Sequence, residues 1–107
     1  MLHLKKNPTL NDFQKYVAEL EIERDFINQS ARDKCLLLGE EVGELFKAVR
    51  KAEGMNIDKN SKIADIGDEL ADILIYICSI ANRFDIDLEN AFRTKEEVNK
   101  KREWTSN

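Results

Sequence analysis

Two pairs of acidic residues have the spacing that would place a cluster of carboxylates on facing helices. The first lies within E-E-V-G-E at residues 40–44 and the second within E-L-A-D at residues 69–72. Residues three positions apart share one face of an α-helix, so two helices that face each other would bring four carboxylates together. Carboxylates at close range raise each other's pKa and cost folding free energy unless a cation neutralises them. The pattern therefore predicts a site for a hard divalent cation, and Mg²⁺ is the usual one where phosphates are also bound.

The second acidic pair lies in the most apolar stretch of the sequence, between residues 63 and 84. Polar residues recur there at spacings of four and three and form one stripe of a helix: Asp65, Glu69, Asp72, Tyr76 and Ser79. No basic residue lies on that stripe before Arg83. An unpaired buried carboxylate costs several kcal/mol, so Glu69 and Asp72 must be protonated, paired or bound to metal. A solvated acidic face is the alternative, and the apolar surroundings of these two residues disfavour it.

The ligand types favour magnesium over zinc or iron. The only histidine is His3, near the N-terminus, and the sequence contains no Glu-x-x-His pair of the kind that holds di-iron centres in helical bundles. Cys35 and Cys78 lie in or beside apolar runs, where buried thiols in a reducing compartment are expected. Ligation by oxygen alone favours Mg²⁺, with Mn²⁺ as a possible substitute.

Composition excludes several classes of protein. A chain of 107 residues fits one domain, expected to span residues 1–107 with its core at 10–103. Hydrophobic residues make up 42% and charged residues 36%, which is typical of helix-rich soluble proteins. The net charge of −4 argues against nucleic acid as a main partner, because binding its phosphates needs an excess of Lys and Arg. No apolar run reaches the roughly 18 residues of a membrane span, and the N-terminus lacks an apolar signal segment, so we expect a cytoplasmic protein without membrane contact.

Hydrophobic periodicity and end signals predict four helices with short connections. They are expected over residues 10–26, 33–53, 63–84 and 88–102. Thr9 and Asp87 are candidate N-caps of the first and last helix, and Ser61 is a candidate cap of the third. Gly54 suits the position just after the end of the second helix. The predicted fold is all-α, a four-helix bundle-like single domain.

The third predicted helix is apolar on almost every side. A helix of this kind is usually central, or is covered on its outer side by a second subunit. A homodimer, or a homotetramer made of two dimers, is therefore expected.

The two acidic motifs, in this order and helical context, resemble the signature E-E-x-x-E followed by E-x-x-D of the MazG-like family of all-α nucleoside triphosphate pyrophosphohydrolases. Residues 23–26 (E-R-D-F) resemble the end of that family's first helix, and residues 85–88 (D-I-D-L) resemble the turn into its last helix. Lys95, Asn99 and Arg102 resemble its C-terminal K-x-x-x-N-x-x-R element. The resemblance covers about residues 10–103.

The resemblance implies a reaction and a set of site residues. The reaction is hydrolysis of a (deoxy)nucleoside triphosphate to the monophosphate and pyrophosphate, in the service of nucleotide-pool cleansing. The implied Mg²⁺ ligands are Glu41, Glu44, Glu69 and Asp72. Glu41 is also implied in catalysis, and Glu40 would support the site from outside the ligand set or orient the attacking water.

The resemblance also implies contacts with the substrate, through Phe26, Tyr76, Lys95, Asn99 and Arg102. Phe26 and Tyr76 would lie near the base or sugar, and the other three would contact phosphates. From the residues alone, Tyr76 has an alternative as a core tyrosine, and the last helix has one as a solvated surface. Two rival functions also stand: a phosphoribosyl-ATP pyrophosphohydrolase, and a helical interaction module whose acidic cluster is structural.

Overall fold

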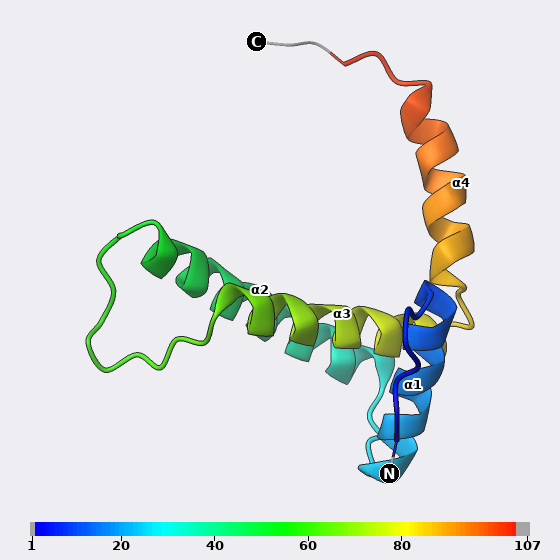
Figure 1. Ribbon diagram of the computed structural model, residues 1–107, viewed down its shortest axis with the longest axis horizontal. Coiled ribbons are helices and arrows are strands. Elements are labelled where there is room, and N and C mark those ends of the chain that lie inside the picture. The colour runs from blue at the N-terminus through cyan, green and yellow to red at the C-terminus, as the bar shows by residue number, and fades with distance from the viewer. Residues whose placement is uncertain (1, 105–107) are drawn as a thin grey trace.

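The computed structural model describes residues 2–104, which form four helices and no strands (Figure 1). The helices are α1 (Leu10–Glu23), α2 (Ala31–Ala52), α3 (Ile66–Arg83) and α4 (Leu88–Lys100). The predicted all-α class is therefore confirmed. None of these helices is both long enough and apolar enough to cross a membrane.

Side-chain caps fix where three of the helices begin. Thr9 and Asp12 form a capping box at α1, in which the Asp12 amide donates to Thr9 Oγ1 at 3.2 Å and the Thr9 amide donates to Asp12 Oδ2 at 2.8 Å. Ser30 and Asp33 form a second capping box at α2. Asp87 caps α4, as predicted, through a hydrogen bond that its side chain accepts from the amide of Asn90. Each such cap stabilises its helix by about 1 kcal/mol.

Helix boundaries differ from the prediction where the backbone turns left-handed at a residue other than glycine. The first helix ends at Glu23 rather than at 26, because Asp25 has φ 61°. Asp85 has φ 53° and interrupts the helical backbone between α3 and α4 in the same way. Gly54, with φ 75°, follows the end of α2 as predicted. Ser61 does not cap α3, which begins at Ile66 with Asp65 in the N-cap position.

The helices form a hairpin, a crossing helix and an extension (Figure 1). Helices α2 and α3 run side by side and are joined by the long loop of residues 53–65. Helix α1 packs against α3 at the end of the hairpin opposite its loop, and α4 extends outward from beside the N-terminal end of α1 (Figure 1). The buried core lies at the crossing of α1 and α3 and consists of Val17, Leu20 and Cys78. Cys78 is buried as predicted, but Cys35, also predicted to be buried, is exposed on α2.

One copy of the chain leaves much apolar surface uncovered. Its radius of gyration is 16.7 Å, against about 13 Å for a compact domain of this length. Leu36 and Phe46 on α2 and Phe92 on α4 are each more than 60% exposed. The four helices therefore do not enclose a common core within a single chain, and the expected homo-oligomer stays a prediction.

Candidate metal and nucleotide site

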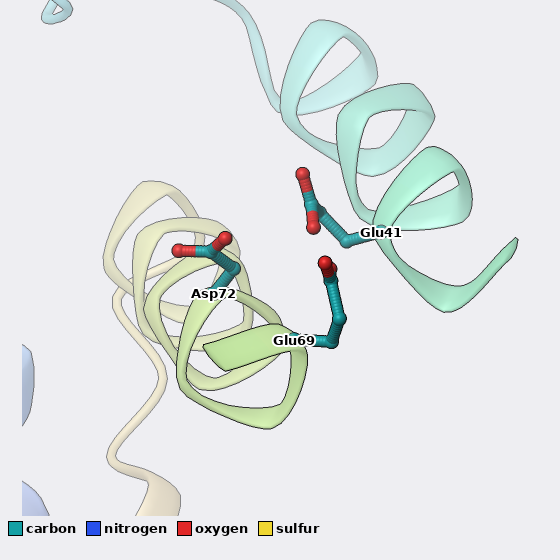
Figure 2. A group of neighbouring side chains, drawn as sticks. All are labelled: Glu41, Glu69 and Asp72. Carbon is teal, nitrogen blue, oxygen red and sulfur yellow. The ribbon is translucent and has the colours of Figure 1, made fainter. Parts of the chain in front are cut away.

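Three of the four acids predicted to bind metal converge between α2 and α3. Glu41 comes from α2, and Glu69 and Asp72 come from α3 (Figure 2). Each offers a carboxylate oxygen, and these three oxygens all lie within 4.8 Å of one another. The convergence follows from the hairpin, because its side-by-side helices turn the i, i+3 pair of α3 toward α2. Figure 2 shows the Glu41 side chain reaching across toward the α3 pair.

Glu69 is the buried member of this cluster, with 6% of its surface exposed. Its Oε2 atom has no hydrogen-bond partner within residues 2–104. Buried polar atoms in folded proteins almost always have a partner, and an unpaired buried carboxylate is costly. The atom therefore needs either a proton or a cation, which fits the residues to a metal ion.

The negative charges of the cluster also repel one another. The pKa of Glu41 is raised from 4.5 to about 7, first by the hydrogen bond it shares with Glu69, then by burial, and then by the charges of Glu69, Asp72 and Glu44. Near neutral pH the three acids therefore hold a proton that a divalent cation would displace. This carboxylate set suits a hard divalent ion, since every ligand atom is oxygen.

Glu44 and Glu40 lie at the edge of the cluster. Glu44 follows Glu41 by three residues on α2, and its carboxylate lies 3.8 Å from Lys47 Nζ. It is near enough to raise the pKa of Glu41 but is not one of the three converging acids. Glu40 is exposed, and its charge helps to raise the pKa of Tyr76. The charges of both residues therefore lie near the site, while their roles as ligand and as catalytic residue stay predictions.

A pocket of about 130 Å³ opens beside Asp72 and is walled by α1, α2, α3 and the loop after α1. Phe26 and Tyr76, which the sequence places near the base or sugar, both line it. Burial raises the pKa of Tyr76, and the negative charges of Glu41, Asp72 and Glu40 raise it further. The Tyr76 hydroxyl therefore keeps its proton and is available as a donor. An aromatic pocket next to a carboxylate cluster can hold a flat ring attached to a metal-bound anion.

A largely buried network of charged residues, which was not predicted from the sequence, lies in and behind the wall of the same pocket. Arg83 forms a two-pronged ion pair with Glu21, at 2.6 Å from Nη2 to Oε2 and 3.0 Å from Nη1 to Oε1. The Ser79 hydroxyl donates to Glu21 Oε1 at 2.9 Å, and Lys34 Nζ lies 3.7 Å from Oε2. Ser79 and Arg83 continue the polar stripe of α3 at spacings of three and four, and Lys34 precedes Glu41 by seven residues on α2. That helical spacing was the available signal.

The residues predicted to contact phosphates lie on α4 or, in the case of Arg102, just beyond its end, away from the acids. Lys95 and Arg102 are exposed, and Asn99 is half-buried with an Oδ1 atom that has no partner within the described range. Helix α4 contacts α1 and extends away from the α2–α3 hairpin (Figure 1). Within one chain the structure does not bring these three residues to the carboxylates, so their contact with phosphate stays a prediction.

Comparison with known proteins points to the same family as the sequence motifs. The chain is 35% identical over 100 residues to dCTP pyrophosphatase 1 of Rattus norvegicus and 34% identical to that of Homo sapiens. Each match covers 89% of this chain and 59% of the relative, so the chain spans about three-fifths of the length of these relatives. The crystal structure of iMazG from Vibrio DAT 722 superposes with a TM-score of 0.64 at 27% identity, covering 87% of this chain and 99% of that one.

The profile of the MazG nucleotide pyrophosphohydrolase domain matches residues 29–104, which include α2, α3, α4 and all three converging acids. The family predicted from the acidic motifs is therefore confirmed. The chain belongs to the MazG nucleotide pyrophosphohydrolase domain family.

Proposed function

We propose that this protein hydrolyses (deoxy)nucleoside triphosphates between the α- and β-phosphates, releasing the monophosphate and pyrophosphate. The observation that carries the proposal is the convergence of Glu41, Glu69 and Asp72, with an unpartnered buried oxygen on Glu69, beside a pocket that has aromatic walls. Family membership supports the same reaction class. The curated relatives are pyrophosphatases for dCTP, which makes pyrimidine deoxynucleotides the first substrates to test.

We propose Mg²⁺ as the cofactor, with Mn²⁺ as a substitute, held by Glu41, Glu69 and Asp72 and joined by Glu44 after a side-chain rotation. When bound, the ion supplies charge neutralisation at the phosphate oxygens and lowers the pKa of a coordinated water. The chain itself does the positioning. The three acids would hold the cation that neutralises the triphosphate end, and the pocket beside Asp72 would hold the ring end.

Six further residues act around the bound substrate in this proposal. Glu40 is exposed on the α2 side of the cluster, where its carboxylate accepts a hydrogen bond from the attacking water and orients it. The Tyr76 hydroxyl donates to the sugar or base, and the Phe26 ring covers the base. Lys95 and Asn99 on α4 and Arg102 just beyond it bind phosphate, which requires the same segment of a second copy in a homodimer or homotetramer. In the cell the activity would cleanse the cytoplasmic nucleotide pool.

The bond that is broken tests the proposal. Purified protein with Mg²⁺ is incubated with a panel of ribo-, deoxyribo- and modified nucleoside triphosphates, and the products are separated by ion-exchange chromatography. The monophosphate and pyrophosphate are expected in equal amounts. Release of the diphosphate and orthophosphate would remove the proposed reaction, and an Asp72→Asn variant that retains full activity would remove the proposed site.

A further inference from the structure

Lys34 is a buried lysine whose ammonium forms an ion pair but no hydrogen bond with its nearest carboxylate. The residue is 4% exposed, and the carboxylate nearest to its ammonium belongs to Glu21. Both oxygens of that carboxylate already accept hydrogen bonds from Arg83, and Oε1 accepts a further one from Ser79. The 3.7 Å between Lys34 Nζ and Glu21 Oε2 is too long for a hydrogen bond. Glu21 thus faces two cations, and Arg83 is the one that forms hydrogen bonds with it.

Arg83 cannot turn toward a ligand, because its remaining donors are also engaged. Its Nε donates to the Gln29 carbonyl at 2.8 Å, and Nη2 donates to the Phe26 carbonyl at 3.1 Å. Within residues 2–104, by contrast, the Lys34 ammonium donates no hydrogen bond. Its ammonium lies 4.9 Å from the centre of the Phe26 ring and 5.6 Å from that of Tyr76, and these faces stabilise the charge without taking up its directional N–H donors. Lys34 is therefore the free donor of the network.

The free donor lies in the wall of the pocket beside the acids. Lys34 lines the pocket of about 130 Å³ together with Phe26, Tyr76 and Asp72. That volume is well below the roughly 300–1,000 Å³ of pockets that enclose a whole small-molecule ligand. A single ring system is the part of a nucleotide that fits, with its phosphates directed toward the carboxylates. The ring would meet aromatic faces and one cationic donor.

We propose that Lys34 is a specificity-determining residue, which donates a hydrogen bond to a carbonyl oxygen of the nucleobase. This inference rests on the proposed function and goes beyond it by naming which bases are accepted. Cytosine, thymine, uracil and guanine carry a ring carbonyl, and adenine does not. A site built to pair with a substrate group rejects an analogue that lacks it, because the buried protein group is then left without a partner.

The test compares wild-type protein with Lys34→Met, which keeps the length of the side chain and removes the ammonium. Values of kcat/KM are measured for dCTP, dTTP, dGTP, dATP and a deoxyribose triphosphate without a base. In the wild type, dATP should be a poorer substrate than the best carbonyl-bearing nucleotide. The substitution should lower kcat/KM roughly 10- to 100-fold for carbonyl-bearing nucleotides and leave dATP and the base-free compound nearly unchanged. Lys51→Met, at an exposed position of the same helix, is the matched control and should alter none of these ratios.

Binding of the monophosphate products gives a readout that does not depend on hydrolysis. Calorimetry should show that dCMP, dTMP or dGMP binds the wild type more tightly than dAMP does, and that Lys34→Met removes the difference. An equal loss for every compound, the base-free one included, would make Lys34 a phosphate or structural contact and overturn the inference. A wild-type preference for adenine would overturn it without any variant. If calorimetry shows the carbonyl preference but no nucleotide is hydrolysed, the proposed reaction fails and the specificity role of Lys34 stands.

Discussion

Glu41, Glu69 and Asp72 are held in an arrangement that is unfavourable for the protein without metal. Their oxygens lie within 4.8 Å of one another, and the buried Glu69 Oε2 has no donor in the described part of the chain. Residues kept for stability alone would relieve this repulsion through a basic partner, as Glu21 does through Arg83. The contrast between the paired acid Glu21 on α1 and the unpaired cluster between α2 and α3 supports the cluster as the candidate functional site.

Asp72→Asn separates a metal ligand from a structural residue. The substitution removes one negative charge and keeps the shape, so the metal-free protein should melt at the same temperature or higher. Activity should be lost. Mg²⁺ should raise the melting temperature of the wild type by binding the folded state, and should do so much less in the variant. Thermal denaturation with and without a chelator measures both effects, and unfolding of the metal-free variant would show that Asp72 stabilises the fold.

The raised pKa of Glu41 predicts how the stability of the metal-free protein depends on pH. Its folded-state pKa of about 7 exceeds the ordinary value of 4.5, so its protonated form favours folding. This contribution is fully present below the ordinary pKa and is lost as the pH rises through about 7. The melting temperature in chelator should therefore fall between about pH 5 and about pH 8. Glu41→Gln should flatten that dependence, and an unchanged slope in this variant would assign the effect to another group.

At the scale of elements, Arg83 connects three parts of the fold. It pairs with Glu21 on α1, and it donates to carbonyls of Phe26 and Gln29 in the loop before α2. The ion pair is buried, with 16% of the Arg83 side chain and 6% of the Glu21 side chain exposed. Burial raises the pKa of Glu21, but hydrogen bonds from Arg83 and Ser79 and the charges of Arg83 and Lys34 outweigh it and lower the pKa overall. Arg83 thus fixes the loop that carries Phe26 to the pocket.

Arg83→Met should destabilise the fold by about 3–5 kcal/mol, because it leaves a buried carboxylate without its main partner. Urea denaturation followed by circular dichroism measures this free energy. Adding Glu21→Gln to Arg83→Met removes the stranded charge and should restore part of the loss. If the double variant is as unstable as the sum of the two single variants, Glu21 and Arg83 contribute independently and the pair is not a unit.

Local signals explain which parts of this fold were predictable. Caps at Thr9 and Asp87 and the glycine after α2 depend on neighbouring residues, and all three were predicted. The left-handed turn at Asp25 was not, because non-glycine residues seldom adopt that conformation and no composition marks it. The start of α3 was placed too early, since the polar loop before it has no packing that a pattern would reveal.

The candidate site likewise has parts that could be predicted from the sequence and parts that could not. The converging acids could be predicted from their spacing, because one repeated helical offset on two helices already determines a shared face. The pairing of Glu21 with Arg83 could not, since it depends on where α1 crosses α3, about 60 residues apart in sequence, which no local spacing encodes. Glu44 shows the remaining gap: spacing places it on the correct face of α2, but its side-chain direction decides whether it joins the cluster.

At the scale of the whole molecule, α4 is the element that a single chain leaves unsupported. It has no buried residue, and Phe92 and Val98 are 68% and 49% exposed. The exposed apolar residues of α2 and α3, Leu36, Phe46 and Leu70 among them, offer a surface of the same kind. Burial of these groups would stabilise an assembly at about 25 cal/mol per Å² of apolar area, so we expect α4 to pack on a second copy of the chain.

An assembly of this kind would also bring Arg102 to a site whose acids belong to another copy. The test mixes two inactive or weakened proteins, Asp72→Asn and Arg102→Ala, after co-expression or joint refolding. If α4 serves the partner, each mixed dimer has one site with intact acids and an intact Arg102, and the mixture should recover roughly a quarter of wild-type activity. If α4 serves its own chain, every site in the mixed dimer carries one of the two substitutions, and activity should not exceed the average of the separate proteins. Native mass spectrometry, with one of the two proteins labelled with ¹⁵N, confirms that the mixed dimer has formed, and recovery absent from a confirmed mixed dimer would place Arg102 outside the partner's site.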